Sequence, residues 1–116
     1  MSRDTQTTVD QFNEAFNRHD VDAVMALMTD DCVFENTSPT PNGERYEGAV
    51  AVRGFWEQFF AGSPNAWFTT EEQFVCGDRA VVRWTYHWSD DGYIRGVDVF
   101  RVRDGKVAEK FAYVKG

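Results

Sequence analysis

Apolar residues recur at helical spacing in three stretches of the chain. The first stretch carries Val9, Phe12, Ala15 and Phe16, with His19 at the same spacing. The second follows Asp20, a residue type that caps helix N-termini, and carries Val21, Val24, Leu27 and Met28. The third covers roughly residues 49 to 61, with Val52, Phe55, Trp56, Phe59 and Phe60 on one face. These patterns predict three amphipathic helices that pack on a common core.

A period of two residues replaces the helical period in the second half of the chain. Four strand-like runs, "AWFTTEEQFVC", "RAVVRWTYHW", "YIRGVDVFRV" and "KVAEKFAYV", are separated by the turn sequences "GD", "SDDG" and "DG". A further short strand, "TDDCVFEN", precedes the segment "TSPTPNGERYEG", whose Pro and Asn-Gly residues predict a loop. The order predicts an α+β domain over residues 1–116, with helices on one face of a curved, mainly antiparallel sheet.

Composition limits the possible partners. The 116 residues are 42% hydrophobic and 16% aromatic, enough for one folded core. With 12 basic and 19 acidic residues, the net charge of -7 offers no basic surface for nucleic acid. No apolar run is long enough for a transmembrane helix, and "MSRDTQTTVDQF" lacks the apolar core of a signal peptide. We therefore expect a cytoplasmic chain with no nucleic-acid or membrane partner.

Cysteine and histidine are too few to indicate a metal site. Cys32 and Cys76 lack the spacing of a ligand pair, and the chain has only two His residues. We expect both cysteines to be buried thiols, and we expect neither a metal nor an organic cofactor.

Asp98 is an unusual residue within an apolar strand. Simple alternation turns it toward the same side as Phe100 and Val102. A carboxylate on that side needs a cation or hydrogen-bond donors, or else it stays protonated with a raised pKa. Two interpretations remain open: an ion pair with Arg95 or Arg101 at an open end of the sheet, or an acid inside an apolar pocket that donates to a bound carbonyl or enol.

The sequence also resembles a known superfamily. The passages "FNEAFNRHDVDAVMALMTDDCVFEN", "YEG" at the start of a helix and "GVDVFRVRDGKVAEKFAYV" are similar to the nuclear-transport-factor-2-like (NTF2-like) superfamily, in its SnoaL-like and ketosteroid-isomerase-like branch. The resemblance implies a cone-shaped α+β fold whose curved sheet wraps around about three N-terminal helices and encloses an apolar pocket. It also implies a homodimer formed through the sheet. It implies little about chemistry, because such folds carry isomerases, cyclases, hydrolases, dehydratases and non-catalytic modules.

The resemblance extends to only part of the isomerase site. Asp98 falls where ketosteroid isomerase keeps a neutral aspartic acid in its oxyanion hole. Asn36 falls at the position of the proton-abstracting aspartate, and Phe12 at that of the oxyanion tyrosine. Because an amide is no base and a phenyl ring has no donor, classical ketosteroid isomerisation is not expected.

Glu35 is the nearby carboxylate that could replace the missing base. In a regular strand Glu35 and Asn36 point to opposite faces, so only one enters the pocket. Glu35 could instead be solvated, or paired with Arg83 or Arg95. His87 is a second proton-transfer candidate, although its position beside "SDDG" favours a solvent-exposed strand end. Either face of its strand, with Trp84, Tyr86 and Trp88 or with Arg83, Thr85 and His87, could line the cavity.

The last hairpin has two possible registers. A strict two-residue turn at "DG" places Asp98 opposite Phe111, on the same face as Glu109 and Tyr113. A glycine bulge at Gly105 shifts the register by one residue and brings Lys110 and Ala112 to that face instead.

These observations predict a small-molecule pocket protein, an acid-base isomerase, cyclase or dehydratase acting on an apolar carbonyl or cyclic metabolite. The predicted catalytic residues are Asp98 and Glu35. The predicted ligand-binding residues are Asn36, Phe12, Phe55, Phe59, Trp84, Phe100 and Tyr113. The alternative is a non-catalytic dimeric module of the same fold that binds a ligand or a partner. A third interpretation takes the aromatic residues as an ordinary core with a collapsed pocket.

Overall fold

The computed structural model describes residues 4–115 and contains helices and strands in the predicted order. The elements are α1 (Thr5–Asn17), α2 (Val21–Ala26), β1 (Met28–Glu35), β2 (Arg45–Glu47), α3 (Ala49–Gly62), β3 (Trp67–Cys76), β4 (Arg79–His87), β5 (Tyr93–Arg103) and β6 (Lys106–Val114). Within residues 4–115, every helix is too short or too polar to cross a lipid bilayer.

The first two helices begin at aspartate caps. The Asp4 carboxylate accepts a hydrogen bond of 2.7 Å from the Thr7 backbone N–H, and the Asp20 carboxylate accepts one of 3.1 Å from the Ala23 N–H. Each cap satisfies a donor that the first helical turn leaves without a partner. The predicted cap at Asp20 is therefore confirmed, although α2 ends at Ala26 and Met28 already belongs to β1.

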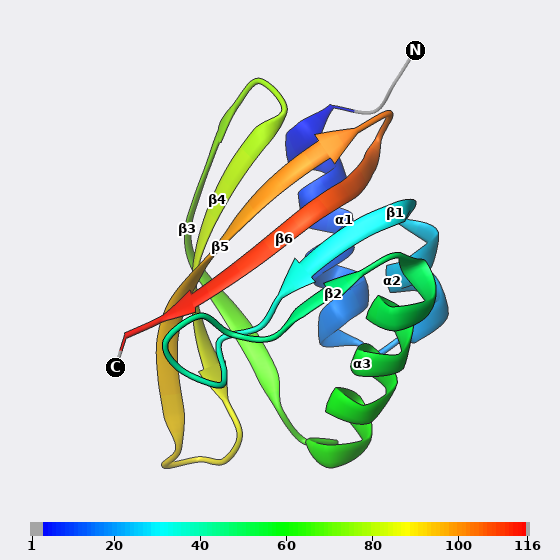
Figure 1. Ribbon diagram of the computed structural model, residues 1–116. Coiled ribbons are helices and arrows are strands. Elements are labelled where there is room, and N and C mark those ends of the chain that lie inside the picture. The colour runs from blue at the N-terminus through cyan, green and yellow to red at the C-terminus, as the bar shows by residue number, and fades with distance from the viewer. Residues whose placement is uncertain (1–3, 116) are drawn as a thin grey trace.

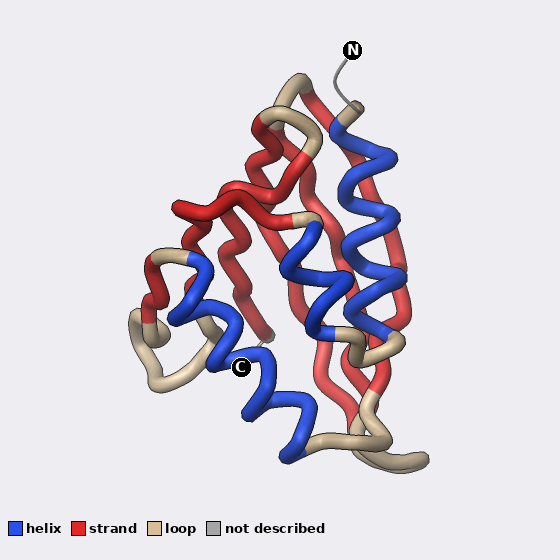
Figure 2. Tube along the Cα trace, turned by 90° about the vertical axis from the view of Figure 1, so that its right-hand side faces the viewer, coloured by secondary structure: helices blue, strands red, loops and turns tan. Residues whose placement is uncertain are grey.

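The six strands form one curved sheet in the order β2-β1-β6-β5-β4-β3. The strands from β3 to β6 form the predicted antiparallel meander, and β1 joins β6 in parallel. Residues 45–47 were expected to lie in a loop, but they form β2, which pairs with β1. The three helices lie on one side of the sheet (Figures 1 and 2). The predicted α+β architecture is confirmed.

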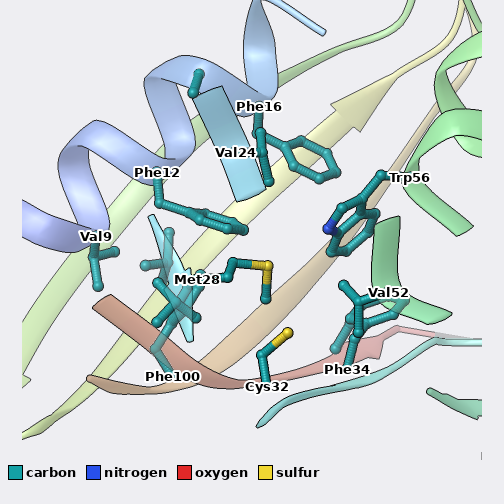
Figure 3. Packing of buried hydrophobic residues seen from close by; sticks show 14 of the residues in the cluster. Val9, Phe12, Phe16, Val24, Met28, Cys32, Phe34, Val52, Trp56 and Phe100 are labelled. Carbon is teal, nitrogen blue, oxygen red and sulfur yellow. The ribbon is translucent and has the colours of Figure 1, made fainter. Parts of the chain in front are cut away.

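The space between helices and sheet is filled by aromatic and aliphatic side chains. Figure 3 shows Phe12, Phe16 and Trp56 in this core, together with Val24 and Met28. The Phe16 ring packs edge to face on Trp56, with ring centroids 5.0 Å apart, and on Phe60 at 4.8 Å. Such geometry is favourable for aromatic pairs, so α1 and α3 are held together through this ring.

The last hairpin combines both features that the sequence left open. Asp104 and Gly105 have φ values of 55° and 74°, which fits a tight two-residue hairpin turn. Beyond this turn the register shifts by one residue. Val102 pairs with Val107 and Arg101 with Glu109, so Ala108 is left without a partner on β5. The bulge therefore lies at Ala108 and not at Gly105, but its effect is the predicted one-residue shift.

The two cysteines lie in different environments. Cys32 is fully buried in the core, and burial raises the pKa of its thiol to about 11. Cys76 is exposed at the end of β3, so the expectation of two buried thiols is wrong for this residue. The pattern of the strand was misleading because β3 lies at the sheet edge, where most of its side chains face solvent.

Candidate functional site

A cavity of about 100 Å³ lies between the sheet, α1 and α3. Its walls are mostly aromatic, and the rings come from Phe16, Phe34, Phe55, Trp56, Phe59, Phe68, Trp84 and Tyr86. Half-buried or exposed residues beside it, such as Asn36, Thr37 and Ile94, connect it to the surface. An apolar cavity with a few polar groups is the usual form of a small-molecule site, and this one is smaller than most, which limits its ligand to a small molecule.

Asp98 and Lys110 form a buried ion pair at this cavity. Asp98 lies on β5 and Lys110 on β6, and the bulge at Ala108 brings both side chains to the inner face of the sheet. The Lys110 Nζ lies 3.4 Å from the Asp98 Oδ2, and the two residues are only 5% and 4% exposed. Such a pair is screened little by solvent, so each charge depends strongly on the other.

Three aromatic rings surround the Lys110 ammonium group. Its Nζ lies 5.1 Å from the Phe16 ring centroid, 5.0 Å from Phe34 and 5.2 Å from Trp56. The negative faces of such rings attract a cation, most strongly where water is excluded. Positive charge at this nitrogen is therefore stabilised from several sides.

One oxygen of the buried Asp98 carboxyl has no hydrogen bond among the described residues. Burial raises the pKa of its carboxyl above the ordinary value, and the nearby Lys110 cation and Trp84 indole only partly oppose this effect. Within residues 4–115, neither the Asp98 Oδ1 nor the Trp84 Nε1 makes a hydrogen bond, and the buried Trp56 Nε1 is also unpaired. The Trp84 indole N–H still lies close enough to the Asp98 carboxyl to lower its pKa, so these two unpaired atoms lie side by side at the cavity.

A glycine makes room for the Trp84 indole. Gly96 pairs with Trp84 across β4 and β5, and a Cβ at Gly96 would lie only 2.6 Å from the Trp84 Cη2 atom. A larger residue there would collide with the ring. In the sequence "RGVD", Gly96 leaves space for the Trp84 indole, and Asp98, two residues after it, supplies the carboxyl.

A second, narrower cleft reaches the ion pair from the side of α1. It has a volume of about 30 Å³, and Asn13, Asn17 and Thr70 stand at its polar end. Asp98 and Lys110 line this cleft as well as the main cavity. The ion pair is therefore reached from two sides, from the aromatic cavity and from this narrow cleft.

Five of the predicted site residues come together at the cavity. These are Asp98, Asn36, Phe55, Phe59 and Trp84. The Asn36 Oδ1 accepts a hydrogen bond of 2.8 Å from the Thr37 backbone N–H, and this leaves its amide N–H groups available. The roles assigned to these residues remain predictions.

Phe12 and Phe100 were predicted to bind a ligand, but both lie in the hydrophobic core. Both are completely buried, with ring centroids 5.7 Å apart, and neither lines the cavity. Strand alternation correctly places Phe100 on the inner face, but it cannot show that α1 covers this part of the face with Phe12. Both rings belong to the hydrophobic core.

Glu35 was predicted as a base and Tyr113 as a ligand-binding residue, but both side chains lie outside the cavity. The Glu35 carboxylate pairs with Arg45 at 2.7 Å, so its partner is neither Arg83 nor Arg95. Tyr113 is 56% exposed, next to Ala112 in a strand where alternate residues face opposite sides. We therefore do not retain Glu35 as a base or Tyr113 as a ligand-binding residue.

Arg95 and Arg101, the expected partners of Asp98, lie on the outer face. Arg95 pairs with Glu71, and Arg101 with Asp78 at 2.7 Å. The partner of Asp98 is instead Lys110. The sequence did not indicate Lys110 as a site residue, nor the Phe16, Phe34 and Trp56 rings around its ammonium group. The one sequence feature that pointed to Lys110 was the alternative hairpin register, which places it on the same face as Asp98.

His87 lies on the outer side of β4. Its ring stacks on Trp67 with centroids 4.6 Å apart, whereas Trp84 and Tyr86 turn toward the cavity. This decides which face of β4 lines the site. Among residues 4–115, no three His, Cys, Asp or Glu side chains gather as metal ligands.

The fold and the enclosed aromatic cavity define a protein of the NTF2-like class, and comparison with known families refines this assignment. The model of the SnoaL-like domain matches residues 9–110. The chain therefore belongs to the SnoaL-like domain family. A comparison with curated proteins finds no match.

Solved structures support the same assignment. An NTF2-like protein of unknown function from Mesorhizobium loti is 42% identical, with 97% of this chain and 91% of that chain covered and a TM-score of 0.86. A candidate polyketide cyclase from Sinorhizobium meliloti is 23% identical over 91% and 93% of the two chains, with a TM-score of 0.79. A candidate ketosteroid isomerase from Kribbella flavida is 19% identical over 99% and 80%, with a TM-score of 0.83. The last two show the shared fold alone.

Proposed function

We propose that this protein binds a small apolar metabolite that carries a carbonyl group or a ring, and acts on it by acid-base chemistry as an isomerase, cyclase or dehydratase. The observation that carries the proposal is the free Oδ1 of the buried Asp98 at the wall of the aromatic cavity. In its protonated form this oxygen donates a hydrogen bond to a carbonyl oxygen, and in its ionised form it accepts a proton.

The surroundings of Asp98 support this role. The Lys110 ammonium stands beside the same space and would stabilise negative charge that develops on a ligand oxygen. The aromatic walls exclude water and would bind the apolar part of the ligand. The Asn36 amide, near the surface end, would orient a polar substituent.

The test is deuterium uptake at the carbon next to the carbonyl of a small cyclic enone such as cyclohexenone, followed by NMR in deuterium oxide. We expect the wild type to accelerate uptake, and Asp98→Asn to lower the rate by about a hundredfold, the usual loss for a catalytic acid or base. Glu109→Gln is the matched control, because Glu109 pairs with Arg101 on the other face of the sheet. Equal rates in the two variants would contradict the role of Asp98.

A second candidate is a non-catalytic dimeric module that binds the same kind of ligand. The observation in its favour is that Asp98 and Lys110 are the only titratable groups at the cavity wall among the described residues, apart from Tyr86. Shifts of the Trp56 and Trp84 indole N–H signals on addition of cyclohexenone, without deuterium uptake, would favour this module over an enzyme.

The outer face of the sheet supports a homodimer in either case. Several exposed aromatic side chains lie there, namely Trp67, Phe74, Tyr93 and Tyr113. We expect sedimentation equilibrium to find a dimer, and Trp67→Glu with Tyr93→Glu to raise its Kd by at least about tenfold. Val50→Glu is the control, since Val50 is 89% exposed on α3, away from the sheet. A monomeric wild type would contradict this proposal.

A further inference from the structure

Lys110 differs from the other lysines of the chain in its environment. The chain has three lysines, and Lys106 and Lys115 are exposed while Lys110 is 5% exposed. A lysine is rarely buried unless it is paired. Its pairing with Asp98 is a weak explanation for its presence, because well-packed apolar residues in place of a buried ion pair are often equally stable or more so.

The lysine nitrogen is placed where a ligand would meet it. Lys110 lines the aromatic cavity, and its neighbour there, Asp98, has one oxygen at 3.4 Å from Nζ and another without a partner. Burial shifts a lysine toward its neutral, nucleophilic form, and an adjacent carboxylate is placed to take the proton that the ammonium must lose.

We propose that Lys110 attacks the carbonyl carbon of an aldehyde or ketone in the cavity and forms a covalent imine with it. This inference rests on the proposed function, because it takes the cavity to bind a carbonyl compound. It goes beyond that function in assigning a covalent intermediate and a nucleophile.

The step balances with Asp98 as its proton carrier. The Asp98 carboxylate first takes a proton from the Lys110 ammonium, and the free amine attacks the carbonyl carbon. The carbonyl oxygen receives that proton as the C–N bond forms. Asp98 then removes a second proton from the nitrogen and returns it to the hydroxyl group, so that the C–O bond breaks and water leaves. The products are a protonated imine, one water molecule and the Asp98 carboxylate, with no oxidant or reductant.

The groups around the Lys110 Nζ favour both the first proton transfer and the protonated imine product. Burial favours the protonated form of Asp98 and raises its pKa, which helps it to take the lysine proton. The rings of Phe16, Phe34 and Trp56 favour the ammonium in the resting protein, and they also stabilise the positive charge of the protonated imine. The apolar walls slow the return of water that would hydrolyse it.

Reductive trapping tests this inference. The full chain is incubated with butyraldehyde and sodium cyanoborohydride, which reduces an imine to a stable secondary amine, and peptide mass spectrometry then measures modification at each lysine. Lys106 and Lys115 in the same sample report the reactivity of solvent-exposed lysines. We expect Lys110 to be modified at least about tenfold faster than either, and about a hundredfold more slowly in Asp98→Asn.

Two further variants separate chemistry from misfolding. Asp98→Glu keeps a proton carrier and should retain most of the trapping rate, and Glu109→Gln should leave it unchanged. Equal modification of the three lysines in the wild type would overturn the inference. If the Trp56 and Trp84 indole signals still shift with butyraldehyde, the covalent step alone has failed. If they do not shift, the proposed carbonyl site has failed with it.

Discussion

Lys110→Met is expected to lower the free energy of unfolding by about 3 to 5 kcal/mol at neutral pH, because it leaves the Asp98 carboxylate buried without its cation. Urea denaturation followed by far-UV circular dichroism measures the change. Lys106→Met is the matched control on the same strand. Lys106 is exposed, so its replacement should change stability by no more than about 0.5 kcal/mol.

The loss should come from the unpaired charge and not from the lost lysine itself. Replacing both partners, in Asp98→Leu with Lys110→Met, removes the two charges together and should restore stability to within about 1 kcal/mol of the wild type or exceed it. A double variant that is no more stable than Lys110→Met would show that the pair contributes through packing or through another partner.

The same variant should have a distinct dependence on pH. The pKa of Asp98 is raised above 3.8 by burial, so its contribution to stability is fully present below that pH and is lost as pH rises through the higher value in the folded protein. Without Lys110, the pKa rises further because the opposing cation is gone. The deficit of Lys110→Met should therefore be smallest near pH 3.8 and grow as the pH rises. A deficit independent of pH would contradict this explanation.

Local sequence patterns were sufficient to predict most of the fold and the orientation of individual strands. Helical spacing located α1, α2 and α3, and alternation placed Asp98 on the inner face with Phe100. Alternation also required Glu35 and Asn36 to face opposite ways, and they do. These features depend only on the spacing of apolar residues within one helix or strand, which can be read from the sequence.

Contacts between elements were harder to predict. The partner of Asp98 depends on the bulge at Ala108, which nothing in "KVAEKFAYV" distinguishes from regular alternation. The strand β2 has only three residues, too few for a period of its own, and it forms because it pairs with β1 across the intervening loop. The resemblance placed Phe12 at a polar site position, yet with a phenyl ring that position is closed by packing on Phe100.

Phe16→Ala should destabilise the protein by about 3 to 5 kcal/mol, the range for removing a buried aromatic ring from a core. Its ring is only 6% exposed and packs edge to face on Trp56, Phe60 and Phe68, with centroids 5.0, 4.8 and 5.5 Å away. It also lies 5.1 Å from the Lys110 Nζ, so the variant weakens the support of the ion pair as well. Phe74→Ala is the control, because Phe74 is 54% exposed and should cost less than about 1 kcal/mol in the same urea titration.

The loss of this ring should also change the site in a way that a ligand can reverse. Phe16 lines both the main cavity and the narrow cleft, so Phe16→Ala joins them into a larger apolar space. Apolar cavities of about 150 Å³ bind benzene, and a ligand that binds only the folded state raises the melting temperature. We expect benzene to raise the Tm of Phe16→Ala by more than that of Phe74→Ala, whose cavity keeps its original volume. A Phe16→Ala variant that loses stability but gains nothing from benzene would show that Phe55, Trp56 and Phe59 collapse into the vacated space, and hence that the cavity walls are held in place by Phe16 itself.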